Sequence, residues 1–188
     1  MTTKLIILDR DGVINYDSDA FIKSPAEWIP IPGSLEAIAR LNQAGYRVVV
    51  ATNQSGVARG LFDMVTLNAI HQKLHTAAQL VGADIDAIFF CPHAADDNCD
   101  CRKPKPGMIH EIAHRFDISL KAVPCVGDSL RDLQAGFVAG CTPHLVLTGK
   151  GEKTYQRGGL PPGTTIHANL AAVVDHLLKT SADAPVAA

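Results

Sequence analysis

The sequence of 188 residues has little net charge and contains no long hydrophobic run. With a formal net charge of −2, it shows no basic excess that would indicate a nucleic-acid or membrane surface. No apolar run is long enough to cross a bilayer, and no secretory signal precedes the first predicted strand. We therefore expect a cytoplasmic protein that binds neither nucleic acid nor membrane.

Internal repeats and recognisable domain linkers are also absent from the sequence. The length fits one domain with a substantial core, which we expect over residues 1–180. Residues 181–188 are mostly small, and we expect them to form a disordered tail.

Strand and helix patterns alternate along the chain, which predicts an α/β fold with a Rossmann-like parallel sheet flanked by helices. Apolar runs predict strands at 5–8, 47–51, 87–90, 122–126 and 145–147. Apolar residues at helical spacing predict helices at about 34–44, 64–81, 107–116, 130–138 and 168–178. The connections at 9–33 and 91–106 leave room for a flap and a loop but not for a lid domain. The cap should therefore be minimal and the site open.

Two carboxylates, Asp9 and Asp11, follow the first predicted strand and precede Gly12. The carboxyl end of such a strand is where open α/β sheets bind their ligands. Two acids there can bind a divalent cation, and one of them can act as a nucleophile on phosphorus. The alternative is an ordinary Asp-Gly turn after the strand.

Polar residues also follow the later strands. The segment Thr52-Asn53-Gln54-Ser55-Gly56 offers a hydroxyl, an amide and loop N–H groups that could hold a phosphoryl oxygen. Arg102 and Lys103 precede a predicted helix, where cations oppose the helix dipole, so a role with an anion is indicated. Asp128 is placed to complete a magnesium site, while Asp132 could equally cap the next helix. Each motif alone could be a solvated turn, but their shared place at one sheet edge favours a phosphate site.

Three of the five cysteines lie in one loop together with a histidine. Cys91, His93, Cys99 and Cys101 follow the pattern Cys-x-His-x5-Cys-x-Cys. Three thiolates and an imidazole form a closed tetrahedral zinc set, with no open position for catalysis. A loop of Asp, Asn and Ala has no core of its own, so bound zinc would order it. It would also fix the position of the segment that leads into Arg102 and Lys103. Free thiols are the alternative.

Other cysteines and histidines are expected to be structural. Cys125 and Cys141 have apolar neighbours in sequence, which predicts two small core residues. The segment 110–114 matches the His-Glu-x-x-His signature of zinc proteases, but both histidines flank the buried stripe of their helix. His71 and His75 share a helix face, and we expect both to be solvated.

Four of these motifs resemble those of the haloacid-dehalogenase (HAD) superfamily of phosphohydrolases. They are Asp9-Arg10-Asp11-Gly12, Thr52-Asn53, Arg102-Lys103-Pro104 and Gly127-Asp128-Ser129-Leu130-Arg131-Asp132. The cysteine loop is similar to that of the histidinol-phosphatase-like branch. Within it, the chain looks most like bacterial phosphatases that remove the 7-phosphate of D-glycero-D-manno-heptose 1,7-bisphosphate. The resemblance implies a magnesium-dependent enzyme with a small sugar phosphate as substrate. We also expect a monomer.

The resemblance also implies how the acidic residues divide the chemistry. Asp9 is the nucleophile that takes the phosphoryl group as an aspartyl phosphate. Asp11 is the general acid for the leaving oxygen and then the base for the attacking water. Mg²⁺ would be held by the carboxylates of Asp9 and Asp128 and by the backbone carbonyl of Asp11.

By the same resemblance, Thr52 and Lys103 stabilise the transferring phosphoryl group, and Arg102 helps to recognise the substrate. The residues expected to contact the substrate also include Asp17, Ser18, Asp19, Ala20, Asn53, Gln54 and Ser55. One departure is Ser129, which stands where relatives often carry a lysine. The resemblance therefore implies no role for Ser129.

Several other functions fit parts of the pattern. Histidinol-phosphate phosphatase shares the fold, the zinc loop and the mechanism. A polynucleotide 3′-phosphatase is disfavoured because the sequence has no basic patch. A receiver-like signalling domain also uses a strand-end aspartate and Mg²⁺, but Asp11 is placed to break down the acyl phosphate. A zinc-only interaction module leaves Asp9 and Asp128 unexplained.

Overall fold

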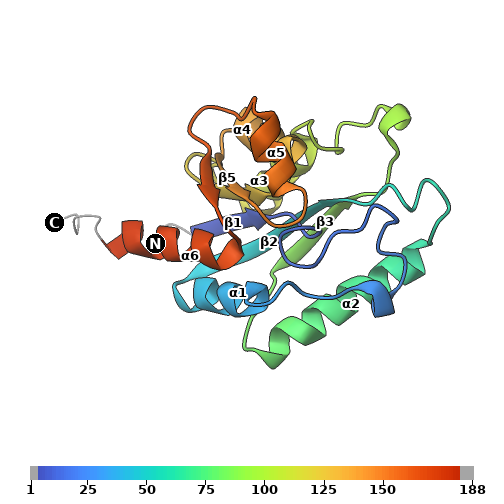
Figure 1. Cartoon of the computed structure of the whole chain (residues 1–188), viewed down its shortest axis with the longest axis horizontal. Helices are drawn as coiled ribbons and strands as arrows, with labels where there is room; N and C mark the ends of the chain where they lie inside the picture. Colours follow the sequence, from blue (N-terminus) through green and yellow to red (C-terminus); the bar gives the residue numbers. More distant parts are fainter. Residues whose placement is uncertain (1–3, 183–188) are drawn as a thin grey trace.

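The first strand, β1 (Lys4–Leu8), lies in the middle of a parallel sheet in the computed structural model, which describes residues 4–182 (Figure 1). The sheet order is β3-β2-β1-β4-β5-β6, and every neighbouring pair is parallel. The other strands are β2 (Tyr46–Asn53), β3 (Ala87–Cys91), β4 (Pro124–Gly127), β5 (Thr142–Val146) and β6 (Thr165–His167). The order reverses between β1 and β4, which is where sheets of this type bind ligands at their carboxyl ends.

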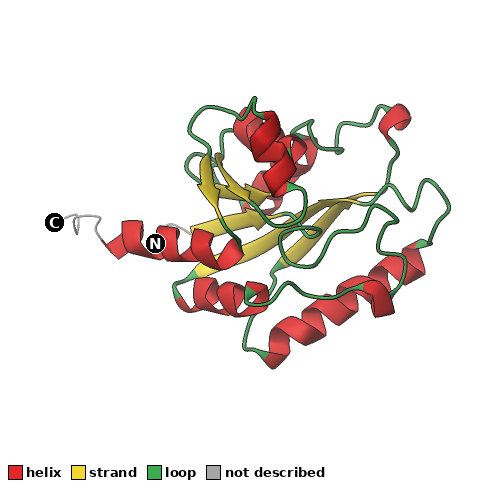
Figure 2. Ribbon diagram, in the orientation of Figure 1, coloured by secondary structure: helices red, strands yellow, loops and turns green. Residues whose placement is uncertain are grey.

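Helices cover both faces of the sheet (Figure 2). One core lies against α1 (Ser34–Gln43), α2 (Met64–Leu80) and α6 (Leu170–Ala182), and the other against α3 (Gly107–Phe116) and α4 (Leu130–Ala139). Because strand side chains alternate between faces, Ile6 enters the first core and Ile7 the second. Full burial of each such side chain stabilises the fold by about 1.5–3 kcal/mol. Two-sided burial is why β1 has a continuous apolar sequence.

The predicted fold class is confirmed, but the C-terminal third differs from the prediction. Within the described residues the sheet has six strands rather than the five predicted, because β6 was missed. The helix α5 (Gly151–Arg157) was also missed. Strand β5 begins at Thr142, before Pro143, a residue that usually argues against a strand. Helix α6 extends to Ala182, two residues into the segment 181–188 that was predicted to be a tail. Residues 183–188 lie outside the described residues.

The two long connections contain no added domain. Between β1 and α1 there is one short 3₁₀ helix (Pro25–Glu27), and between β3 and α3 another (Ala95–Asp97). Lys73 of α2 fastens the first connection, since its Nζ donates to the carbonyls of Pro25 (2.6 Å) and Trp28 (2.8 Å). The flap is therefore anchored rather than loose. Among residues 4–182 there is no helix with both the length and the apolar character needed to cross a membrane.

Candidate active site

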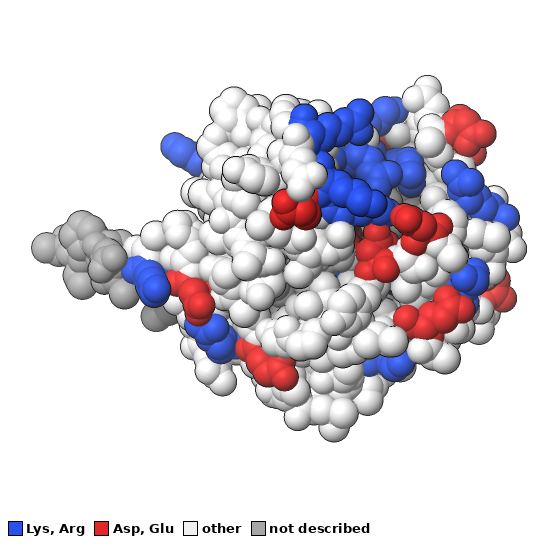
Figure 3. Space-filling model, in the orientation of Figure 1, with Lys and Arg blue, Asp and Glu red and all other residues white. Residues whose placement is uncertain are grey.

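A pocket of about 260 Å³ lies at the carboxyl ends of the central strands. It brings together nearly all of the predicted site residues: Asp9, Asp11, Asp17, Ser18, Asp19, Thr52, Asn53, Gln54, Ser55, Arg102, Lys103 and Asp128. Ala20 does not line it, since this exposed residue instead forms a turn with Ser18 and Lys23. Arg59, Arg131 and Lys150 add positive charge that the sequence did not predict at this place. Lys and Arg side chains gather on the upper part of the face drawn in Figure 3, with acidic side chains directly beneath.

Lys103 is a buried cation at the floor of this pocket. Its Nζ lies 3.1 Å from Asp9 Oδ1 and 2.6 Å from Asp132 Oδ1, and it donates to the Ala51 carbonyl at 2.7 Å. Burial lowers the pKa of Lys103, but the charges of Asp132 and Asp9 outweigh it and raise the pKa above the ordinary value. The ammonium group is therefore charged and held beside Asp9.

Asp132 serves this lysine as well as its own helix. Its Oδ2 accepts hydrogen bonds from the Ser129 backbone N–H (3.0 Å) and hydroxyl (2.5 Å) at the start of α4. Burial opposes ionisation, but the Lys103 charge lowers the pKa of Asp132 overall. The predicted capping role is thus present together with a buried ion pair.

Asp9 and Asp128 face each other across the switch between β1 and β4. Burial is the largest cause that raises the pKa of both, to about 7 for Asp9 and about 8 for Asp128. The charge of Asp132 adds to each shift, while Lys103 partly offsets the shift of Asp9. Carboxylate oxygens of these three acids lie within 4.8 Å of one another. A hard divalent cation fits this set, because it would reverse the mutual repulsion and accept oxygen ligands.

The turn after β5 holds Asp128 in place, and the sequence analysis missed it. The backbone N–H of Lys150 donates to Asp128 Oδ2 at 2.7 Å, and the Thr148 hydroxyl donates to the Gly12 carbonyl at 2.6 Å. Gly12 (φ +83°) and Gly149 (φ +58°) both have left-handed backbone, and a Cβ on either would collide with the Asp128 carboxylate. A Thr-Gly-Lys-Gly turn after a strand was the available signal.

Asp11 is surrounded by hydrogen-bond donors. Arg10 donates from Nε (3.1 Å) and Nη2 (2.9 Å) to Oδ1, and Asn15 Nδ2 donates to the same oxygen at 2.9 Å. Gln54 Nε2 donates to Oδ2 at 2.9 Å. Burial would raise the pKa of Asp11, but the Arg10 charge and these hydrogen bonds lower it overall. The ionised carboxylate is therefore the favoured form in this arrangement.

His71 contradicts the prediction that it is solvated. The residue is buried and its Nε2 lies 3.3 Å from Arg10 Nη1. The error arose because helical spacing places His71 on a face but does not show what that face packs against. His75 is partly exposed, and His110 and His114 are exposed as predicted.

The segment after β2 and the segment before α3 are joined by side chains. Asn53 Nδ2 donates to the Lys103 carbonyl at 3.0 Å, and the Lys103 N–H donates to Asn53 Oδ1 at 3.1 Å. Gln54 also donates to the Thr52 hydroxyl at 3.0 Å. Arg102 Nη1 donates to the His93 carbonyl at 3.2 Å. The amide of Asn53 thus fixes the backbone of Lys103, a contact that motif matching alone did not reveal.

The acidic residues of the flap approach the turn after β5. Lys150 Nζ lies 2.8 Å from Asp17 Oδ2 and 3.5 Å from Asp19 Oδ1. Lys150 therefore connects the flap, through its side chain, with Asp128, through its backbone. Charged groups therefore line this side of the pocket.

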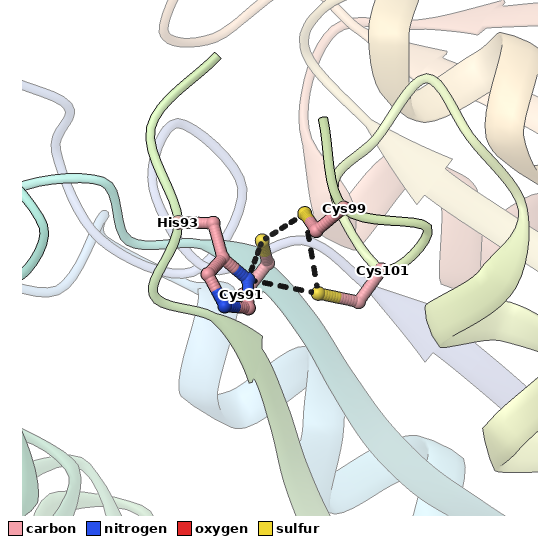
Figure 4. A group of neighbouring side chains, drawn as sticks. All are labelled: Cys91, His93, Cys99 and Cys101. Carbon is pink, nitrogen blue, oxygen red and sulfur yellow. Dashed lines mark hydrogen bonds between the residues drawn. The ribbon is translucent and has the colours of Figure 1, made fainter. Parts of the chain in front are cut away.

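The four predicted zinc ligands converge in space (Figure 4). His93 Nδ1 lies 3.6 Å from Cys91 Sγ and 3.4 Å from Cys101 Sγ, and Cys99 Sγ lies 3.6 and 3.5 Å from the same two sulfurs. Zn–S and Zn–N bonds of about 2.3 and 2.0 Å at tetrahedral angles require separations of roughly 3.5–3.8 Å. The donor set therefore fits a tetrahedral zinc ion. Cys125 and Cys141 are buried in the core, as predicted.

Comparison with known proteins agrees with this geometry. The family model of the haloacid dehalogenase-like hydrolases matches residues 7–140. The D-glycero-beta-D-manno-heptose-1,7-bisphosphate 7-phosphatase of Bordetella bronchiseptica is 65% identical over 176 residues, which cover 94% of this chain and 98% of the relative. The phosphatase of the same name from Pseudomonas aeruginosa is 52% identical over 179 residues, or 95% and 100% of the two chains.

A solved structure is similar over the same length. It is the crystal structure of D,D-heptose 1,7-bisphosphate phosphatase from B. bronchiseptica complexed with magnesium and phosphate. The TM-score is 0.93 at 64% identity, and the match covers 94% of this chain and 99% of the other. The family match, the activity for which the relatives are named and the acid-lined pocket agree on one class of enzyme. The chain belongs to the haloacid dehalogenase-like hydrolase family and is a phosphoric monoester hydrolase.

Proposed function

We propose that this chain removes the 7-phosphate of D-glycero-β-D-manno-heptose 1,7-bisphosphate in a magnesium-dependent reaction. The observation that carries the proposal is the 65% identity to a phosphatase of that name over nearly its whole length. The pocket supports it, because five cations line it while only two, Arg102 and Lys103, were expected from the sequence. A substrate with two phosphate groups carries more negative charge than a monophosphate, so additional cations in the pocket suit it.

In the first step, a carboxylate oxygen of Asp9 attacks phosphorus and the bond between phosphorus and the sugar oxygen breaks. Asp11 gives its proton to that leaving oxygen, so the products are an aspartyl phosphate, the sugar hydroxyl and the Asp11 carboxylate. Lys103 and Thr52 hold the negative charge of the transferring group. Lys103 Nζ lies 3.1 Å from Asp9, and Thr52 is a buried residue that lines the same pocket. General acid catalysis of this kind contributes about 10²–10⁴-fold.

In the second step, Asp11 takes a proton from water, and the water oxygen attacks the aspartyl phosphate. Phosphate leaves, Asp9 returns as a carboxylate and Asp11 is again protonated. The donors around Asp11 favour its ionised form, which suits the base of this step and the product of the first step. The phosphate charge of a bound substrate raises the proton affinity of Asp11 before the first step.

Mg²⁺ would be held by the Asp9 carboxylate, the Asp11 backbone carbonyl and the Asp128 carboxylate. When bound, it supplies a positive charge beside the phosphoryl oxygens. Zinc would be held by Cys91, His93, Cys99 and Cys101, where four protein ligands leave no vacancy for water or substrate.

A substrate panel tests the proposal. Specificity constants should be measured with the β and α anomers of the heptose bisphosphate and with histidinol phosphate, in Mg²⁺ buffer. We expect the β anomer to have the largest kcat/KM. A larger value for histidinol phosphate would assign the chain to the alternative activity, and a trapped phosphoenzyme that persists for minutes would favour a signalling domain.

A further inference from the structure

Arg10, between the two catalytic aspartates, does not line the pocket, and its guanidinium group contacts Asp11 on one side and His71 on the other. Arg10 is 0% exposed. Its Nε and Nη2 edge holds the Asp11 carboxylate, with Nη2 at 2.9 and 3.0 Å from the two oxygens. Its other terminal nitrogen, Nη1, lies 3.3 Å from Nε2 of His71 on α2. His71 and Asp11 are therefore linked through one guanidinium group.

The direction of the His71 contact follows from the chemistry of arginine. A guanidinium group has only donors, so His71 Nε2 must accept and the ring proton must reside on Nδ1. Burial and the Arg10 charge lower the pKa of His71 to about 3, so the ring stays neutral at neutral pH. The ring also packs against Phe90, with centroids 5.8 Å apart. The acceptor is thus fixed in position and in protonation state.

Fixing Nη1 fixes the rest of the guanidinium, because the group is planar and rigid. A buried arginine that loses one partner leaves donors unsatisfied, and it would turn towards other acceptors. Any such rotation moves the Nε and Nη2 edge and the Asp11 carboxylate with it. A displacement of about 1 Å at a reacting group can lower a rate by ~10²-fold.

We propose that His71 is a positioning residue that acts through Arg10 to hold Asp11 where it gives its proton to the leaving sugar oxygen. This inference rests on the proposed general-acid role of Asp11. As the proton leaves, a carboxylate forms on Asp11, and the oriented Arg10 stabilises it. His71 does not line the pocket, so its effect on Asp11 runs through Arg10.

The dependence on leaving group tests this role. The value of kcat/KM is measured for p-nitrophenyl phosphate, whose phenolate leaves without a proton, and for an alkyl phosphomonoester that the wild type hydrolyses. The heptose bisphosphate is the first choice of alkyl ester. The variants are His71→Phe, which keeps a ring without an acceptor, and His71→Gln, which keeps an acceptor. The matched control is His75→Phe, one turn along α2. Within the described part of the chain, the side-chain hydrogen bonds of Arg10 go to Asp11 and His71 and not to His75.

We expect His71→Phe to lower kcat/KM for the alkyl ester about tenfold or more beyond any loss for p-nitrophenyl phosphate. His71→Gln should retain most of the wild-type ratio, and His75→Phe should leave it unchanged. If His71→Phe does not fold, Arg10→Lys should show the same selective loss, because a lysine cannot contact Asp11 and His71 in this way.

Equal losses with both leaving groups, or no loss with either, in a folded His71→Phe would overturn the inference. The underlying proposal is tested separately with Asp11→Asn. If Asp11→Asn itself shows no dependence on leaving group, the general-acid role is wrong. If Asp11→Asn shows that dependence and His71→Phe does not, only the role of His71 is wrong.

Discussion

Replacing Lys103 by methionine would remove the one cation that separates two buried carboxylates. Lys103 has a side chain only 3% exposed, between Asp9 at 3.1 Å and Asp132 at 2.6 Å. Methionine has a similar length and no charge, so the change removes the ion pairs while leaving little empty space. Without bound metal, Asp9, Asp128 and Asp132 would then face one another without the ammonium group that contacts two of them.

The loss of stability can be judged from the burial of the pair. Removal of one partner from a buried ion pair destabilises a protein by about 3–5 kcal/mol. For a chain of this size, 1 kcal/mol corresponds to roughly 2–4 °C in Tm, so Lys103→Met should lower Tm by roughly 6–20 °C in magnesium-free buffer. Added Mg²⁺ should recover part of this loss, because the acids regain a cation.

Activity should fall independently of stability. Lys103 is placed to hold charge on the transferring phosphoryl group, and removal of one such group lowers kcat by about 10²–10³-fold. The assays are calorimetry with and without Mg²⁺, and kcat measured well below the Tm of the variant. Magnesium should restore stability but not turnover.

The control is Lys105→Met in the same loop. Lys105 pairs with Asp100 at 3.3 Å, but the two side chains are 43% and 95% exposed. An exposed pair contributes at most about 1 kcal/mol, so Tm should fall by no more than a few degrees. Equal shifts in Tm for the two variants would contradict the argument from burial, and full activity in Lys103→Met would contradict its proposed role.

Three further outcomes are expected. Asp9→Asn should abolish turnover, because an amide cannot attack phosphorus, and it should leave the metal-free Tm unchanged or higher; measurable turnover by the purified variant would exclude Asp9 as nucleophile. Cys99→Ser should lower both the zinc content, measured by elemental analysis, and Tm. It should also reduce kcat/KM by up to ~10²-fold, because the loop before Arg102 loosens. Wild-type protein that contains no zinc and has full activity would contradict this. In magnesium-free protein, Asp9 and Asp128, with pKa values raised to about 7 and about 8 from an ordinary 3.8, keep protons that the unfolded chain loses. Their contribution to stability should therefore fall as pH rises from about 4 to 8, and Mg²⁺ should raise Tm more at pH 8 than at pH 5; equal shifts at both pH values would be inconsistent with these raised pKa values.

The sequence was sufficient to predict the sheet edge and most of the residues that gather there. Asp9, Thr52 and Asp128 each lie at or just after the end of a strand, and parallel strands bring those ends to one edge. The zinc ligands were found for a related reason, since short spacings along a loop already limit how far apart the side chains can lie. In both cases, the position of a residue along the chain already limits where its side chain can lie.

The residues that support the site were decided by tertiary packing. His71 and His75 lie on the same face of one helix, so the sequence pattern does not distinguish them. The packing of α2 makes His71 a buried partner of Arg10. Lys150 lies beyond β5, in a region whose helix α5 has no apolar stripe to reveal it, yet its N–H holds Asp128. A sequence pattern reports which face of an element is apolar, but hydrogen bonds between distant elements depend on atomic positions that only the packed chain defines.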